Sequence, residues 1–210
     1  MLKGNVSGCA WQRSVVVSSV ACFAWVGGVS VVRAQEDRAQ KRVARQRVEV
    51  PVERIDVGDG DTVVIRWAAG DEEIVRILGI DTPETQNVAH NLPYAQSFGY
   101  QATAFAQGAF AAATKVELLR FEQMDRYGRT LGYLFINGKN FSALIVRARL
   151  AAESVSHYGD NGFPEESQAV LEAARAAGPL PFEPPHEYRR RMREVTEWMR
   201  AQGLLPPADD

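Results

Sequence analysis

Acidic and basic side chains that could together cleave a phosphodiester bond are spread along the first two thirds of this 210-residue chain. The carboxylates are Asp61, Asp81 and Glu84, and the guanidinium groups are Arg76 and Arg129. Carboxylate oxygens are hard ligands that suit Ca²⁺ and can direct a water molecule, whereas arginine presents a bidentate fork to phosphate oxygens. The ordered set therefore predicts a metal-assisted phosphodiesterase site, although no piece is specific alone.

Each of these segments also has a structural interpretation. Asp59-Gly60 is a pair common in hairpin turns, Thr82-Pro83-Glu84 could form a turn or begin a helix, and Tyr127-Gly128-Arg129 could be a tight turn between strands. Their co-occurrence favours chemistry. Arg76 lies between two apolar residues of an expected strand, and a guanidinium there needs an acidic partner to offset its desolvation.

The two aspartates need a positive charge as well. Asp61 and Asp81 are expected at the ends of neighbouring strands, where they would repel each other unless a cation lay between them. An all-oxygen set of ligands favours Ca²⁺ over zinc. Strict alternation puts Arg76 and Asp81 on opposite faces of one strand, so we assume that the chain bends near Gly79 and turns Asp81 toward the site.

In this order and at about this spacing, the segments resemble the staphylococcal nuclease, or thermonuclease, family over roughly residues 48–178. The resemblance implies a metal site and a catalytic trio, both matched in residue type. The metal ligands would be Asp61, Asp81 and the carbonyl oxygen of Thr82, and the catalytic residues would be Arg76, Glu84 and Arg129. Arg126 and Tyr127 are similar to the residues that flank the nucleotide phosphate. We place Asp59 behind the metal ligands, in contact with the metal through water.

The activity that the resemblance implies is calcium-dependent hydrolysis of phosphodiester bonds in DNA, RNA or both, with low sequence specificity and 3'-phosphate ends. Glu84 would orient or deprotonate the attacking water, and Arg76 and Arg129 would stabilise the charge of the five-coordinate transition state. The alternative is a catalytically inactive barrel that binds single-stranded nucleic acid or a protein partner. We infer no obligate protein partner.

Charge is unevenly distributed, although the whole chain carries a net charge of only -2. Residues 1–47 contain eight Lys or Arg and two Asp or Glu, whereas residues 48–178 contain eleven and eighteen. A protein that coats duplex DNA usually has a basic surface. We therefore expect nucleic-acid affinity to be local, supplied by a divalent cation and the site arginines.

The N-terminal part divides into two segments. Residues 1–34 contain an uncharged run, Ser14–Val32, followed by a sequence that fits small-residue cleavage, so we interpret them as a signal peptide for export to the periplasm or the medium. A retained membrane anchor is the alternative, because the run approaches the length that spans a bilayer. Residues 35–47 are charged and nearly free of apolar side chains, which predicts a solvated basic linker.

Apolar periodicity in residues 48–178 predicts an α+β fold that is mainly β. Alternating or continuous apolar runs predict five strands, at residues 48–52, 63–67, 74–80, 115–121 and 131–136. Turns at 58–60 and 70–71 would make the first three strands a meander. Apolar stripes predict three packed helices, around residues 102–113, 141–148 and 170–174. This order suits a five-stranded oligonucleotide-binding (OB) barrel, which the resemblance also implies.

Residues 179–210 form a separate C-terminal extension in this interpretation, with a Pro-rich spacer and a last helix. The helix would place Tyr188, Met192, Val195 and Met199 on one face. Its basic run, Arg189-Arg190-Arg191 and Arg193, is interleaved with glutamates, which favours a solvated face on a helix that docks back on the barrel. A helix that binds a partner is the alternative.

Overall fold

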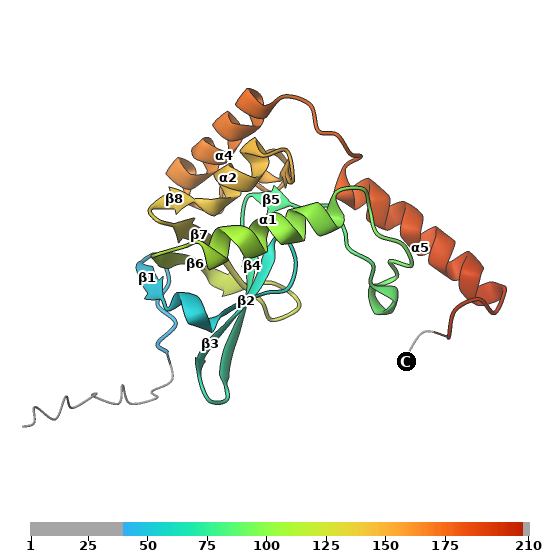
Figure 1. Cartoon of the computed structure of the whole chain (residues 1–210), viewed down its shortest axis with the longest axis horizontal. Helices are drawn as coiled ribbons and strands as arrows, with labels where there is room; N and C mark the ends of the chain where they lie inside the picture. The colour runs from blue at the N-terminus through green and yellow to red at the C-terminus, as the bar shows by residue number, and fades with distance from the viewer. Residues whose placement is uncertain (1–39, 208–210) are drawn as a thin grey trace, which may run out of the picture. The chain divides into compact units, whose positions relative to one another are not determined.

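A curled seven-stranded sheet dominates the computed structural model, which describes residues 40–207 (Figure 1). Its strand order is β1-β6-β7-β4-β3-β2, and β8 pairs with β7. The strands are β1 (Arg47–Val50), β2 (Ile55–Val57), β3 (Thr62–Ala68), β4 (Asp71–Ile77), β6 (Val116–Met124), β7 (Thr130–Ile136) and β8 (Lys139–Asn140). A second, two-stranded sheet pairs β5 (Ile80–Asp81) with β9 (Ala152–Glu153).

Five α-helices accompany the sheets in the described part of the chain: α1 (Gly99–Ala111), α2 (Phe141–Arg147), α3 (Val155–Tyr158), α4 (Pro164–Ala177) and α5 (Pro185–Ala201). Two 3-10 turns cover Val52–Arg54 and Val88–His90. The expected mixed fold, mainly β, is confirmed, and the three expected packed helices correspond to α1, α2 and α4. Their buried residues, such as Ala106, Phe141 and Val170, join the main core with the interior of β6 and β7.

The expected meander is present, but its first strand differs from the prediction. Antiparallel β2, β3 and β4 follow one another, and Ile55 pairs with Ile65. The expected strand at residues 48–52 ends at Val50, because Pro51 has no N–H to donate and a 3-10 turn follows. That strand, β1, pairs with β6 instead of β3. The short strand β2, which the sequence pattern did not predict, lies beside β3 instead.

The expected bend at Gly79 is confirmed. β4 ends at Ile77, Gly79 has a φ of +80°, and the chain resumes as β5, which pairs with β9 instead of continuing the large sheet. A Cβ at this glycine would also lie 2.9 Å from the Tyr133 hydroxyl oxygen, so both conformation and space require glycine. Because of the bend, Arg76 and Asp81 do not lie on one continuous strand, so the alternation of faces does not apply between them and both side chains can face the same site.

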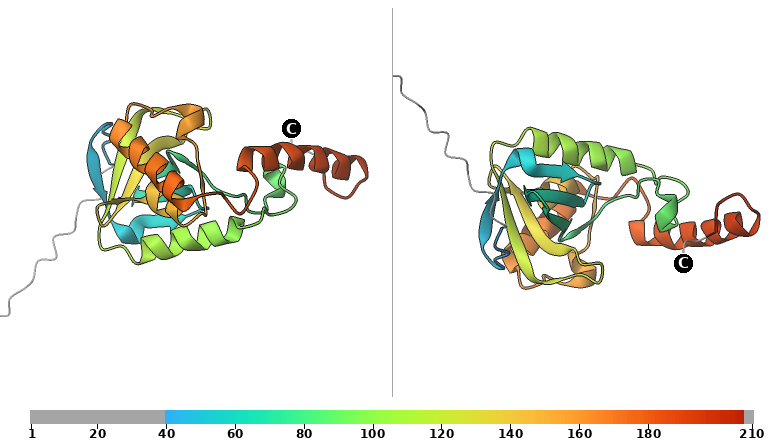
Figure 2. Two further views of the ribbon diagram at one scale, coloured as in Figure 1. Left: turned by 90° about the horizontal axis from the view of Figure 1, so that it is seen from above. Right: turned by 90° about the horizontal axis from the view of Figure 1, so that it is seen from below.

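Helix α5 docks on the loop between β5 and α1, as both views in Figure 2 show. Leu92 of that loop packs with Tyr188 and Met192 of α5, and Val195 lies against them. This small cluster is separate from the main core. The helix therefore docks back, as expected, but through an irregular loop.

The N-terminal predictions lie mostly outside the described residues. The signal peptide or anchor at residues 1–34 and the first part of the linker are among them. Of the linker, Arg42 forms an ion pair with Asp71 at 2.6 Å and Arg45 one with Glu122 at 2.6 Å. From Gln40 onward the segment therefore lies on the domain, in place of the solvated tether that we expected. Within residues 40–207, no helix is both long and apolar enough to cross a membrane.

Candidate active site

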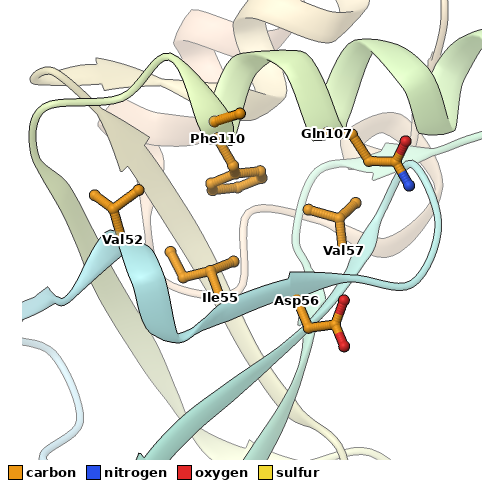
Figure 3. A pocket seen from close by; sticks show the side chains of 7 residues that line it. Val52, Ile55, Asp56, Val57, Gln107 and Phe110 are labelled. Atoms are coloured by element: carbon orange, nitrogen blue, oxygen red, sulfur yellow. The ribbon is translucent and has the colours of Figure 1, made fainter.

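One pocket of about 1380 Å³ gathers every residue that the sequence singled out as functional. Its lining includes Asp59, Asp61, Arg76, Asp81, Thr82, Glu84, Arg126, Tyr127 and Arg129. A smaller pocket of about 240 Å³ lies between β2 and α1 and is lined mainly by apolar side chains (Figure 3). Its lining includes Gln107 and Asp56, but the Asp56 carboxylate points away from α1 (Figure 3). The larger pocket is therefore the candidate active site.

The hairpin before β3 holds Asp61 against Thr82. The Oδ2 atom of Asp61 accepts hydrogen bonds from the backbone N–H and the hydroxyl of Thr82, at 2.9 and 3.0 Å. The backbone N–H of Asp61 donates to Asp59 Oδ1 at 3.1 Å. Gly60 permits this approach, because a Cβ there would lie 2.7 Å from Thr82 Cγ2. The Asp59-Gly60 turn, which from the sequence could be purely structural, thus also positions the Asp61 carboxylate.

Arg76 joins the two aspartates of the proposed metal site. Its Nη1 atom forms an ion pair with Asp61 Oδ1, and its Nη2 atom lies 3.2 Å from Asp81 Oδ1. Burial lowers the pKa of the Arg76 guanidinium, and the charges of Asp81 and Asp59 oppose that shift. We expected an acidic partner for this arginine, and the structure provides two, Asp61 and Asp81. In this structure Arg76 itself separates the two carboxylates that would otherwise repel each other.

Arg129 is fixed by the turn that connects β6 to β7. Its Nε atom lies 2.8 Å from Asp125 Oδ2, while Asp125 Oδ1 accepts the backbone N–H groups of Tyr127 and Arg129, both at 2.9 Å. Burial would raise the pKa of Asp125, but these hydrogen bonds outweigh it and lower that pKa. At the rim, Arg126 donates to the Tyr127 hydroxyl at 2.6 Å, and the Tyr127 side chain is exposed.

Glu84 is held by a residue that sequence reasoning missed. The backbone N–H of Glu84 donates to Gln96 Oε1 at 3.2 Å, and the Gln96 N–H donates to the Glu84 carbonyl at 2.8 Å. Gln96 is buried, and its amide also donates to the Glu183 carbonyl of the spacer at 2.7 Å. Burial raises the pKa of Glu84, which the hydrogen bond from Arg189 opposes. A glutamine in a loop carries no pattern that could have identified it.

Arg189 corrects our interpretation of the last helix. We expected the basic run on a solvated face, whereas its guanidinium reaches both oxygens of Asp81, at 3.0 and 2.9 Å, and Glu84 Oε1 at 2.5 Å. Burial would lower the pKa of Arg189, but the contacts with the two carboxylates outweigh it and raise that pKa. The available signal was its position beside Tyr188, at the edge of the apolar face.

Residues 74–178 match the family model described as staphylococcal nuclease homologue, which is half of the chain. The chain belongs to the staphylococcal nuclease family. The matched segment contains Arg76, Glu84 and Arg129, whereas the hairpin with Asp59 and Asp61 precedes it.

Several curated proteins of this nuclease family are similar to the chain. The thermonuclease of Staphylococcus intermedius is 37% identical over 94 residues, 44% of this chain and 53% of the relative. The thermonuclease of Staphylococcus hyicus is 37% identical over 98 residues, 46% and 55% respectively. The SPbeta prophage-derived endonuclease YokF of Bacillus subtilis (strain 168) is 27% identical over 134 residues, 61% and 43% respectively. The chain thus spans about half the length of the curated relatives it matches.

The pocket provides oxygen ligands for a hard cation but holds them with arginines. Within residues 40–207, no group of three or more His, Cys, Asp or Glu side chains is arranged as a metal centre. The donor chemistry still fits Ca²⁺, because Asp61 and Asp81 supply carboxylates beside the backbone of Thr82, and Ca²⁺ binds such oxygens. A cation would have to replace part of the guanidinium contacts to these carboxylates.

Proposed function

We propose that this member of the staphylococcal nuclease family is a calcium-dependent nuclease that hydrolyses DNA, RNA or both with low sequence specificity and leaves 3'-phosphate ends. The observation that carries the proposal is the convergence of all nine sequence-predicted residues in one pocket. The nuclease names of the relatives support it. We also infer that the curled sheet is an OB barrel.

Asp61, Asp81 and the carbonyl oxygen of Thr82 would hold the cation, and Asp59 would reach it through a water molecule. When bound, Ca²⁺ would act as a Lewis acid toward a phosphate oxygen. The hydrogen bonds from Thr82 to Asp61 Oδ2 fix that carboxylate before any ligand arrives. Such preorganisation lowers the cost of ordering ligands when a cation binds.

Glu84 would accept a proton from the attacking water as the water oxygen forms a bond to phosphorus. Its burial raises its pKa, which makes the carboxylate a stronger base than a solvated glutamate. The bond from phosphorus to the 5' oxygen then breaks, that oxygen takes up a proton from solvent water, and the phosphate stays on the 3' oxygen. Arg76 and Arg129 would donate to the other phosphate oxygens, where charge increases in the transition state. Arg126 and Tyr127, at the rim, would bind the neighbouring nucleotide.

The test measures digestion of single-stranded DNA and of RNA by the chain with calcium and with excess chelator. Glu84→Gln keeps the shape of the side chain and removes the base, so it should abolish digestion in calcium. Glu53→Gln, on an exposed residue outside the pocket, is the matched control and should digest at the wild-type rate. A folded wild type that binds single strands and cleaves none with calcium would favour the inactive binding barrel.

A further inference from the structure

We propose that Arg189 competes with the divalent cation for Asp81 and occupies the proposed base Glu84, so that α5 is an autoinhibitory arm of the nuclease site. The inference rests on the proposed function, because the cation is the one assigned there to Asp81. It concerns a residue outside the segment that matches the nuclease family model, residues 74–178.

The contacts of Arg189 use the atoms that a cation needs. The Oδ1 and Oδ2 atoms of Asp81 accept hydrogen bonds from the two Nη atoms of Arg189. Asp81 Oδ1 also accepts a hydrogen bond from Arg76 at 3.2 Å. Glu84 Oε1 accepts a hydrogen bond from the Nη1 atom of Arg189, which also donates to Asp81 Oδ1. Ca²⁺ lies about 2.3–2.6 Å from its oxygen ligands, so a cation on Asp81 and a guanidinium on the same two oxygens would repel each other at close range.

Burial distinguishes Arg189 from its neighbours in the basic run. Its side chain is 31% exposed, whereas Arg190, Arg191 and Arg193 are exposed residues. A guanidinium that is partly desolvated and bidentate on a carboxylate forms a stronger contact than a solvated one. Removal of Arg189 should therefore affect the carboxylates far more than removal of an equal charge one residue further along α5.

The attachment of α5 allows it to leave without opening the main core. Besides the small cluster around Leu92, hydrogen bonds to the same loop hold α5: Tyr188 donates to the Tyr94 carbonyl at 3.0 Å and Thr196 donates to the Asn91 carbonyl at 3.1 Å. The His186 ring of α5 also stacks on His157 of α3, with 6.5 Å between the ring centroids. Arg200 donates to Asn91 Oδ1 at 2.7 Å. Segments with few buried apolar contacts open locally at low cost. Opening of α5 would withdraw Arg189 from the pocket.

Thermodynamic linkage makes the competition reciprocal. If docked α5 weakens cation binding, then a bound cation must weaken the docking of α5 by the same factor. Two independent quantities therefore report on it: the calcium affinity of the chain and the exposure of α5 to solvent. Neither requires that nucleic acid be cleaved.

The first experiment titrates Ca²⁺ into the wild-type chain, Arg189→Ala and Arg190→Ala by calorimetry at 0.15 M salt. We expect Arg189→Ala to bind Ca²⁺ more tightly, by at least about fivefold, the lower end of ordinary coupling between sites. Arg190→Ala removes the same charge from the next residue and should stay within about twofold, because Arg190 is exposed, does not line the pocket and is screened by salt over about 8 Å. Met192→Ala, which weakens the docking cluster and keeps Arg189, should also bind Ca²⁺ more tightly.

The second experiment measures amide hydrogen exchange in α5 of the wild type, where saturating Ca²⁺ should accelerate exchange. An unchanged or weaker Ca²⁺ affinity in Arg189→Ala would overturn the inference. So would a rate of amide hydrogen exchange in α5 that does not change when Ca²⁺ is added. If Arg189→Ala lowers turnover without a gain in affinity, then Arg189 binds phosphate instead. If the shifts appear but no variant cleaves nucleic acid, then the competition between Arg189 and the cation stands, and the proposed function fails together with the inhibitory role of α5. If no variant binds Ca²⁺, the inference fails, whatever the chain cleaves.

Discussion

A buried ion pair in the main sheet should make the stability of the domain sensitive to the loss of one partner. Glu73 of β4 accepts from Arg120 of β6 through both carboxylate oxygens, at 2.7 and 2.8 Å, and both residues are almost fully buried. Glu73 also accepts from the Thr130 hydroxyl at 2.8 Å and the Trp67 indole at 2.7 Å. The cluster therefore joins β3, β4, β6 and β7, and β4 carries Arg76.

Replacement of Arg120 by Met removes two charge-assisted hydrogen bonds and leaves the buried Glu73 carboxylate with one longer cationic contact, Arg42 Nε at 3.5 Å from Glu73 Oε2. Breaking one side of a buried pair costs about 3–5 kcal/mol. For a domain of this size, the melting temperature should fall by roughly 6–20 °C. Arg66→Met, which breaks the exposed pairs with Asp56 and Glu72, is the matched control and should change it little.

The pH dependence supplies a second check on the same pair. Burial alone would raise the pKa of Glu73, but its hydrogen bonds and the charge of Arg120 outweigh burial and lower that pKa. The stabilisation is therefore complete above the ordinary glutamate value of about 4.3 and is lost as the pH falls through the lowered pKa. The difference between wild type and Arg120→Met in the free energy of unfolding should shrink over that range.

Thermal and urea unfolding, followed by circular dichroism between pH 3 and pH 8, measures these quantities. Glu73→Gln with Arg120→Met should recover part of the loss, because no buried charge remains unpaired. The reasoning is refuted if Arg120→Met unfolds like Arg66→Met at pH 7, or if its deficit stays constant as Glu73 protonates.

Three further predictions concern the site. Arg129→Ala should lower turnover roughly a hundredfold or more, the scale for one transition-state donor, with the folded state intact by circular dichroism; unchanged turnover would remove Arg129 from the catalytic set. Gly60→Ala should weaken calcium binding by calorimetry, because its Cβ would displace Thr82 from Asp61, whereas Gly58→Ala, whose Cβ meets only Thr62 O at 3.5 Å, should not. Gln96→Ala should lower kcat by a larger factor than it raises KM, because it removes the hydrogen bond that holds the backbone of Glu84. Equal fold-changes in kcat and KM would contradict that role.

Local chemistry made most of the site readable from the sequence. Asp61 and Arg76 could be expected in one site because the ordered segments resemble the nuclease family, because few residue types bind a hard cation or a phosphate, and because a charged residue on an apolar strand requires a partner. The bend at Gly79 could be inferred from the same requirement. Helices α1 and α4 were predictable because their apolar stripes follow the helical period.

Strand pairing and the role of α5 were not readable, for physical reasons. The alternation of Val48 and Val50 shows that one face is buried, but it is equally compatible with β3 or β6 as the neighbour. The sequence places Arg189 beside Tyr188 at the edge of the apolar face of α5, but only the three-dimensional course of the spacer brings that edge to Asp81. Gln96 acts through its amide in an irregular loop, where no periodicity applies.

The charge balance of the pocket explains how an acidic domain could attract a polyanion. The pocket is lined by five carboxylates and five guanidinium groups: Asp59, Asp61, Asp81, Glu84 and Asp125 against Arg76, Arg126, Arg129, Arg189 and Arg193. Before a cation binds, these charges cancel. Exchange of Arg189 for a doubly charged cation would leave one net positive charge close to the carboxylates, where a phosphate would bind. A bound cation would then do more than polarise the phosphate: it would also displace Arg189 and create the local attraction that residues 48–178, with a surplus of acidic side chains, otherwise lack.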